Sequence, residues 1–173
     1  MEEKFDFLKG LDNFEKVWQR VIGEKSASQP EPEEKPRPRN KSSDIEKLQH
    51  FMDGECGAVA TYSELARKCR GWTRETLMNI LVDERTHLKK LQLEYFLLTG
   101  DSYAAPKVRP NVSGILSSLR LAYLDERKAN KEYTEAAKET ENQDLAELFR
   151  EIADDEAKHG EKLRCMIEQS LSE

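Results

Sequence analysis

Two similar stretches of the sequence decide the fold of this chain: Asp83-Glu84-Arg85-Thr86-His87 and Asp155-Glu156-Ala157-Lys158-His159. In both, lysine and leucine follow three and four residues after the histidine. Residues three positions apart lie on the same face of a helix, so each stretch can present a carboxylate and an imidazole to one point. The sequence therefore predicts two helices whose Glu/His pairs face a common centre.

The two stretches belong to a longer internal repeat. Laying Glu55 over Glu126 also aligns apolar, aromatic and acidic positions, and one residue of slippage then aligns the two Glu/His stretches. The further aligned pairs are Leu48/Leu119, Ala58/Ala129, Tyr62/Tyr133, Glu64/Glu135 and Ala66/Ala137. The repeat indicates two similar helical hairpins, and it adds Glu55 and Glu126 to the candidate site.

Four long helices are expected after residue 43, and no segment resembles a strand. Ser43-Asp44-Ile45-Glu46 has the capping-box pattern that opens a first helix, and Gly71 closes it. Thr73 can cap a second helix, which runs to Gly100. The remaining two helices are expected over about residues 114–142 and 144–170.

The connections between these helices indicate the topology. The links at residues 71–73 and 141–143 are short, so they join antiparallel neighbours. The thirteen residues 101–113, with Pro106 and Pro110, can span about 40 Å, which is roughly the length of a 26-residue helix. The expected fold class is therefore an all-α, ferritin-like four-helix bundle, in which one long crossover joins two antiparallel hairpins.

The N-terminal part of the chain is expected to differ from this bundle. Residues 1–25 predict an extra amphipathic helix, which packs on its own bundle or a symmetry mate, or docks another protein. Residues 26–43 form a linker with four of the six prolines and one apolar residue. Residues 44–173 form the bundle. The apolar stripe of the N-terminal helix consists of Phe7, Leu11, Phe14, Trp18 and Val21.

Composition restricts the class of protein further. The net charge of -6 argues against a nucleic-acid or anionic-membrane surface. No stretch approaches the roughly 20 apolar residues that span a bilayer, and the acidic N-terminus does not resemble a signal peptide. The three cysteines, Cys56, Cys69 and Cys165, form no CxxC pair. We therefore expect a soluble, cytoplasmic protein with reduced thiols and no membrane or nucleic-acid partner.

Six side chains are expected to meet in one layer of the bundle. At about 1.5 Å per residue they all lie roughly 16 to 22 Å from the turn of their own hairpin. Four carboxylates and two imidazoles suit a pair of iron or manganese ions with open positions and disfavour structural zinc. The predicted metal ligands are Glu55, Glu84, His87, Glu126, Glu156 and His159.

The aspartates before these ligands, Asp83, Asp125 and Asp155, are expected to face outward or to contact the ligands rather than bind metal, because adjacent helix positions do not share a face. His50 lacks a glutamate at this spacing and is expected at the surface. Cys56 follows Glu55 directly and points elsewhere on the helix, so it is not expected to act as a redox ligand.

Residues 44–171 resemble the ferritin-like domain of the rubrerythrin family through Glu55-x6-Tyr62, Glu84-x2-His87, Glu126-x6-Tyr133 and Glu156-x2-His159. The resemblance implies a non-haem di-iron centre that reacts with hydrogen peroxide or oxygen. It further implies terminal or bridging roles for the four glutamates and terminal roles for the two histidines. Tyr62 and Tyr133 would be catalytic-site residues that donate hydrogen bonds to the carboxylates.

Two departures from that family affect the expected function. Rubrerythrins carry a further glutamate three residues after the third-helix ligand, where this chain has Ala129, which calls into question the ligand exchange of their peroxidase cycle. The sequence also lacks a rubredoxin domain, so an external electron-donor protein is expected.

The function expected from the resemblance is a di-iron oxidoreductase of the peroxidase or ferroxidase type that protects against oxidative stress. A homodimer or larger homo-oligomer is expected. The alternatives are a ferritin-like protein for iron oxidation and storage, a manganese catalase, and a tethered cargo or interaction protein whose di-metal site is structural.

Overall fold

The computed structural model describes residues 40–104, 106–110 and 112–172. The helix predicted for residues 1–25 lies outside the described residues, and so does most of the linker predicted for residues 26–43. The fold is therefore described for the bundle alone.

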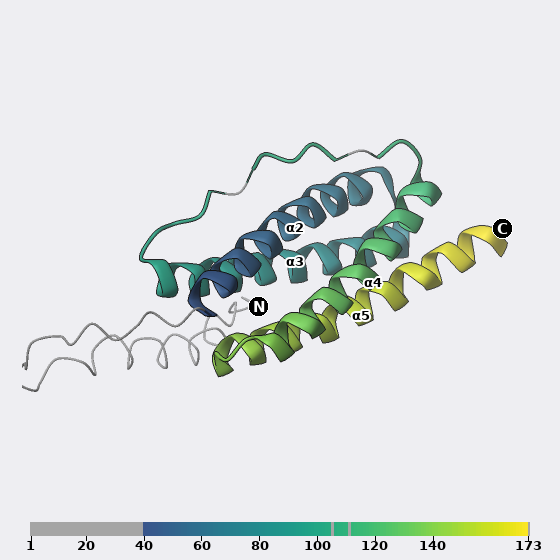
Figure 1. Ribbon diagram of the computed structural model, residues 1–173. Coiled ribbons are helices and arrows are strands. Elements are labelled where there is room, and N and C mark those ends of the chain that lie inside the picture. Colours follow the sequence, from purple (N-terminus) through teal and green to yellow (C-terminus); the bar gives the residue numbers. More distant parts are fainter. Residues whose placement is uncertain (1–39, 105, 111, 173) are drawn as a thin grey trace, which may run out of the picture. The chain divides into compact units, whose positions relative to one another are not determined.

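The bundle consists of four α-helices, α2 (Asn40–Lys68), α3 (Gly71–Thr99), α4 (Ile115–Glu139) and α5 (Gln143–Ser172), and the described residues contain no strand. Helices α2 and α3 form one hairpin and α4 and α5 form the other (Figure 1). The hairpins meet where α3 contacts α5 and where α2 contacts α4. The predicted ferritin-like four-helix bundle is confirmed.

The long crossover between α3 and α4 also matches the prediction. The chain leaves α3 at one end of the bundle, runs along its side and begins α4 at the other end (Figure 1). Gly100 makes the exit from α3 possible, because its φ of 79° is left-handed while its N–H donates a 2.8 Å hydrogen bond to the carbonyl of Phe96. The crossover places α4 beside α2, and the short turn after Glu139 makes α5 antiparallel to α4.

The predicted start of the first helix at Ser43 is wrong. Helix α2 begins at Asn40, so Ser43 lies within its first turns and the linker ends earlier than residue 43. The hydroxyl of Ser42 donates to the Glu46 carboxylate over 3.4 Å, one turn further along the same helix. The polar residues that resemble a cap in the sequence thus lie inside the helix, and Asp44 among them is buried and accepts a 3.0 Å hydrogen bond from the Thr140 hydroxyl after α4.

The predicted cap at Thr73 is also wrong, because the turn between α2 and α3 is shorter than the sequence suggests. Helix α3 begins at Gly71, whose φ is 56°, and the carbonyl of Arg70 already accepts a 3.4 Å hydrogen bond from the N–H of Arg74. The Arg74 guanidinium donates to the Ala66 carbonyl at the end of α2. This side chain satisfies a carbonyl at the C-terminal end of α2, whereas Arg70, the residue before α3, makes no side-chain hydrogen bond to the start of α3.

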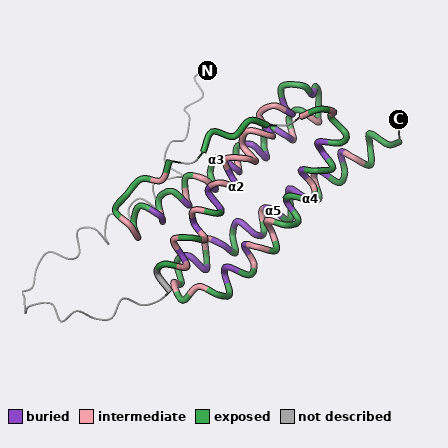
Figure 2. Tube along the Cα trace, turned by 45° about the horizontal axis from the view of Figure 1, so that its top comes forward, coloured by how far each residue is buried: buried purple, intermediate pink, exposed green. Residues whose placement is uncertain are grey.

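Buried residues recur along each of the four helices (Figure 2). They form two hydrophobic clusters separated by a polar layer. One cluster lies toward the start of α2 and includes Leu48, Phe51, Leu91 and Phe149. The other lies toward the end of α2 and includes Leu65, Leu77, Ile80, Leu119 and Leu163. Between them, every helix contributes buried charged side chains at the same height.

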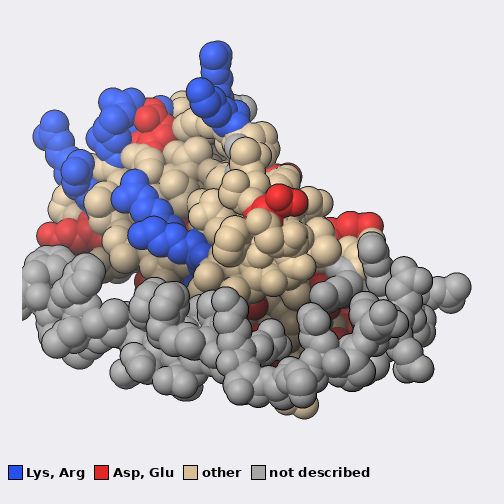
Figure 3. All heavy atoms as spheres, turned by 90° about the vertical axis from the view of Figure 1, so that its left-hand side faces the viewer, with Lys and Arg blue, Asp and Glu red and all other residues tan. Residues whose placement is uncertain are grey.

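The surface carries mixed charges. On the end of the bundle that faces left in Figure 1, lysine and arginine gather over one part of the face, while aspartate and glutamate are scattered and a broad area carries neither (Figure 3). None of the helices in the described part of the chain is long and apolar enough to cross a membrane.

Two glycine substitutions should change stability in opposite directions. Gly100→Ala should destabilise the fold by about 1–2 kcal/mol, because its left-handed backbone brings a β-carbon against the following carbonyl. Gly54 lies within α2, where an added β-carbon meets nothing within 4 Å, so Gly54→Ala should stabilise the fold by about 0.5–1 kcal/mol. Urea denaturation of both variants measures the difference, and shifts of the same sign would contradict this account of the two positions.

Candidate metal centre

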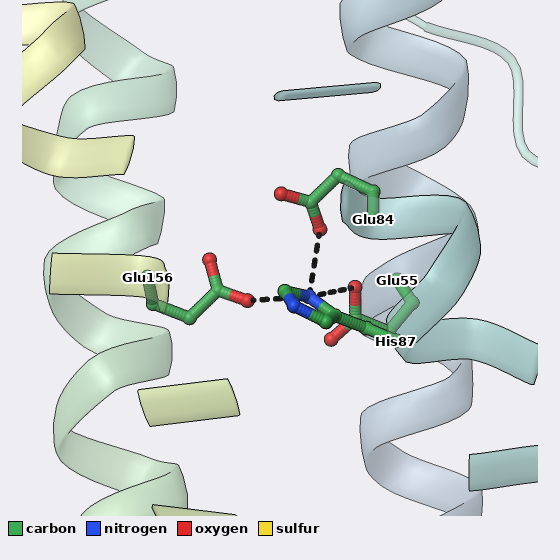
Figure 4. A group of neighbouring side chains, drawn as sticks. All are labelled: Glu55, Glu84, His87 and Glu156. Carbon is green, nitrogen blue, oxygen red and sulfur yellow. Dashed lines mark ion pairs between the residues drawn. The ribbon is translucent and has the colours of Figure 1, made fainter. Parts of the chain in front are cut away.

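The structure brings all six predicted ligand residues into one buried layer. Glu55 comes from α2, Glu84 and His87 from α3, Glu126 from α4, and Glu156 and His159 from α5, and each side chain is between 1% and 4% exposed. The ligands form two overlapping groups of four residues. Within each group, every residue offers one ligand atom, and these four atoms lie within 4.8 Å of one another. The groups are Glu55, Glu84, His87 and Glu156 (Figure 4), and Glu84, Glu126, Glu156 and His159.

The two groups share Glu84 and Glu156, which lie between the two histidines. The Nδ1 atom of His87 is 3.2 Å from Glu156 and 3.9 Å from Glu84. The Nδ1 atom of His159 is 3.0 Å from Glu84 and 3.3 Å from Glu156. Each shared carboxylate can therefore bridge two positions, whereas Glu55 and Glu126 each belong to one group only.

Two tyrosines of the repeat bind Glu55 and Glu126, which we call the outer carboxylates because each belongs to only one group. Each tyrosine bonds the carboxylate of the other hairpin. The hydroxyl of Tyr133, on α4, donates a 2.5 Å hydrogen bond to Glu55 on α2. The hydroxyl of Tyr62, on α2, donates to Glu126 on α4. Both rings are buried, so each hydrogen bond fixes a carboxylate orientation that solvent cannot disturb.

The aspartates before the Glu/His pairs contact the outer ring nitrogens of the histidines. The Nε2 atom of His159 is 3.1 Å from Asp83, and that of His87 is 3.5 Å from Asp155. Each contact crosses from one hairpin to the other. A carboxylate at Nε2 favours the proton on that nitrogen and leaves the Nδ1 lone pair facing the centre. Asp125, the third such aspartate, is exposed.

The glutamates divide into two pairs by their pKa values. Burial raises the pKa of Glu55 and of Glu126 well above the usual carboxyl value, and neighbouring carboxylates add to the rise. Burial acts in the same direction on Glu84 and Glu156, but hydrogen bonds from neighbouring protonated groups outweigh it and lower their pKa values. Without metal, these shifts favour a proton on Glu55 and Glu126 and a negative charge on Glu84 and Glu156.

The histidines compensate the charge of the shared pair. Burial opposes a positive charge on both rings, yet their contacts with the glutamates raise the pKa of His87 to about 12 and that of His159 to about 9. Two imidazolium ions then face two carboxylates and two neutral carboxylic acids. Protons on both imidazoles and on Glu55 and Glu126 would therefore offset the charge of the metal-free layer.

A pair of divalent metal ions fits this layer. Among the described residues, Glu55 Oε2, Glu84 Oε1, His87 Nδ1 and Glu156 Oε1 are buried with ion-pair neighbours but without a hydrogen bond of normal geometry, although such atoms are normally satisfied. All four point into the cluster, where a metal ion would contact them (Figure 4). Four carboxylates and two neutral imidazoles also balance two divalent ions, so metal can replace four protons without changing the net charge.

The other residues discussed from the sequence lie around this layer. His50 is exposed, as expected, but it lies 3.4 Å from Glu132 on α4. The thiol of Cys56 is half-buried and its pKa is raised, first by burial and then by nearby carboxylates, so it stays protonated. Ala129 borders a cavity that reaches the four glutamates from outside.

The fold and the cluster define a ferritin-like four-helix bundle with a buried Glu/His site that is able to bind metal. The more particular relationship is with one family: residues 117–172, which cover most of α4 and α5, match the family model for rubrerythrin. The resemblance to the rubrerythrin family predicted from the sequence is thus confirmed. The match covers the second hairpin, and the internal repeat extends the same ligand pattern to the first.

Solved structures show the same fold. A hypothetical protein from Pyrococcus furiosus has a TM-score of 0.67 and 23% identity over 78% of this chain and 94% of that one. A ferritin-like, diiron-carboxylate protein from Bacillus anthracis has a TM-score of 0.64 and 22% identity over 76% and 99% of the two chains.

A two-domain protein from Anabaena variabilis, with DJ-1/ThiJ/PfpI-like and ferritin-like domains, has a TM-score of 0.63 and 14% identity over 92% of this chain and 49% of that one. A search of curated protein sequences found no significant match.

Removing the charge of Asp83 should weaken metal binding. Asp83→Asn leaves an oxygen beside the His159 imidazole but removes the negative charge that raises its basicity, so the affinity for Mn²⁺ should fall about 10- to 100-fold. Asp154→Asn is the matched control, because Asp154 is exposed on α5 and its loss removes the same charge. Equal affinities of the two variants in a calorimetric titration would show that Asp83 does not position the histidine.

Metal binding should release protons and strengthen as the pH rises. The His159 contribution to metal-free stability is fully present below its usual pKa of 6.5 and is lost as the pH rises through about 9. Glu55 and Glu126, whose pKa values are raised, lose their contribution in the same direction. The metal-free protein should therefore melt at a lower temperature at pH 9 than at pH 6.5, and Mn²⁺ should raise the melting temperature more at pH 9.

Calorimetric titration with Mn²⁺ in two buffers of different ionisation enthalpy counts the released protons. Release of several protons per chain near pH 7 is expected. An enthalpy that does not depend on the buffer would contradict the protonation states given for the layer.

Proposed function

We propose that this chain is a non-haem di-iron oxidoreductase of rubrerythrin type that reduces hydrogen peroxide or oxygen. The observation that supports this most strongly is a buried Glu/His layer that is open on its carboxylate side. A cavity reaches Glu55, Glu84, Glu126 and Glu156 from the surface. Neither His87 nor His159 lines it. Small oxidants therefore have a path to the carboxylate face of the layer, where bound metal ions would meet them.

Two ferrous ions bound in this layer would supply the two electrons that cleave a peroxide bond. The chain itself contributes orientation and an environment of low polarity. Tyr62 and Tyr133 fix Glu126 and Glu55 through hydrogen bonds, and Asp83 and Asp155 orient the two imidazoles. The hydrophobic clusters on both sides of the layer keep bulk water away from it.

Continued turnover requires electrons from outside the bundle. The three cysteines are free thiols, and two of them, Cys56 and Cys69, have pKa values raised mainly by burial, so they are not reactive thiolates. We therefore also propose an external electron-donor protein. A cytoplasmic location, a homo-oligomeric assembly and a role in oxidative-stress protection belong to the same proposal.

A manganese catalase is the second candidate, because the donor set favours it as much as it favours iron. Carboxylates and imidazoles accept either metal, and their charges balance two divalent ions of either element. Metal analysis and the reaction with hydrogen peroxide separate this candidate from iron oxidation and storage and from a purely structural metal site.

Metal content tests the site that both candidates share. Protein purified without oxygen and supplied with Fe²⁺ should hold two ions per chain by elemental analysis. His87→Ala removes a buried ligand candidate and should leave at most one ion, whereas His50→Ala, which removes the exposed histidine, should leave two. Absence of stoichiometric metal in the unmodified chain, or equal loss in both variants, would overturn the proposed site.

Reaction with peroxide tests the activity. The ferrous protein mixed with hydrogen peroxide in a stopped-flow spectrometer should develop ferric absorption while peroxide is consumed without release of oxygen gas. Oxygen evolution by manganese-loaded protein would favour the catalase instead. A large mineral core after repeated additions of iron and oxygen would favour storage, and bound metal that does not react would favour a structural site.

A further inference from the structure

The cavity above the carboxylate layer is larger than hydrogen peroxide or oxygen requires. Its volume is about 410 Å³, whereas a water molecule takes up roughly 30 Å³ in the liquid. It lies between α2 and α4, and the crossover residues Val108, Arg109 and Pro110 border it. A cavity of this volume lies within the range of small-molecule binding sites.

Small residues keep this cavity open at the level of the metal site. Ala58 lies three residues after Glu55, and Ala129 lies three residues after Glu126, so each alanine is on the same helix face as an outer carboxylate and one turn beyond it. The two alanines correspond to each other in the internal repeat, and both line the cavity. A larger side chain at either position would project into the space beside the carboxylates.

The remaining walls are partly apolar. Phe51, Tyr62 and Tyr133 provide aromatic surface, and Gly57 adds no side chain. The alanines and the aromatic rings can therefore contact a short hydrocarbon group, while the polar end of the same molecule faces Glu55 and Glu126.

The charges around the cavity favour a neutral occupant. Asp53, Asp125 and Glu132 border it together with Arg109 and Lys128, so acidic and basic groups lie close together. These acidic and basic groups offset each other, so the cavity favours neither an anion nor a cation. A hydroperoxide keeps its proton at neutral pH and carries no net charge.

We propose that this cavity binds the alkyl group of small organic hydroperoxides, so that their O–O bond lies against the carboxylate side of the metal site. This inference rests on the proposed function and names a further substrate class for it. In the balanced reaction the O–O bond of ROOH breaks, two protons and two electrons are taken up, and ROH and water leave. The electrons are those of the two ferrous ions. Ala58 and Ala129 determine how large the alkyl group can be.

Binding to the metal-free chain tests the cavity independently of the activity. tert-Butanol has the shape of the product alcohol, and saturation-transfer NMR should detect its binding to the metal-free full-length protein. Ala129→Leu fills the cavity and should abolish the signal. Ala157→Leu makes the same change on the exposed face of α5 and should retain it. Ala58→Leu fills the cavity from α2 and serves as a second variant in case Ala129→Leu does not fold.

Kinetics of the iron-loaded protein then test the substrate class. Ala129→Leu or Ala58→Leu should lower kcat/KM for tert-butyl hydroperoxide by about 10-fold or more, since the added atoms occupy the alkyl site, and should change kcat/KM for hydrogen peroxide far less. Equal effects on both peroxides, or tert-butanol binding that both cavity variants retain, would overturn the inference and leave the proposed function intact. If the unmodified protein binds tert-butanol but reduces neither peroxide, the proposed function fails, and this inference fails with it.

Discussion

The burial of four carboxylates and two imidazoles in one layer is the constraint on which the rest of this structure depends. A layer of ionised side chains inside a hydrophobic core would be strongly unfavourable unless its charges cancelled. Here they cancel in two ways. Without metal, the raised pKa values of His87 and His159 favour imidazolium ions beside Glu84 and Glu156, and the raised pKa values of Glu55 and Glu126 favour their neutral forms. With two divalent ions, all four glutamates are charged and both imidazoles are neutral.

This exchange of protons for metal explains why the contacts around the layer run between the hairpins. Tyr133 of the second hairpin bonds Glu55 of the first, and Asp83 of the first contacts His159 of the second. Each half therefore supplies the groups that orient the other half. These contacts lie where the helices of the two hairpins meet, between α3 and α5 and between α2 and α4, so loading the layer with metal should stabilise the bundle as a whole.

Much of this arrangement could be predicted from the sequence, because the repeat fixes chemistry and spacing together. The bundle, the crossover and the meeting of all six residues follow from helix geometry alone. The caps at Ser43 and Thr73 were wrong, because α2 already begins at Asn40 and α3 at Gly71, so both residues lie inside their helices. The partners of Asp83 could not be predicted, because they depend on how far each helix is rotated about its axis. The cavity depends on the separation of α2 and α4, which no local pattern encodes.

The central claim is that this layer holds two metal ions between the six residues. Anomalous diffraction at the iron edge, from crystals grown with Fe²⁺ in the absence of oxygen, tests it directly. The account predicts two iron peaks inside the layer, with Glu84 and Glu156 between them and one histidine Nδ1 atom at each. A layer without iron peaks, or iron bound only at surface carboxylates while the six side chains keep their metal-free contacts, would contradict it.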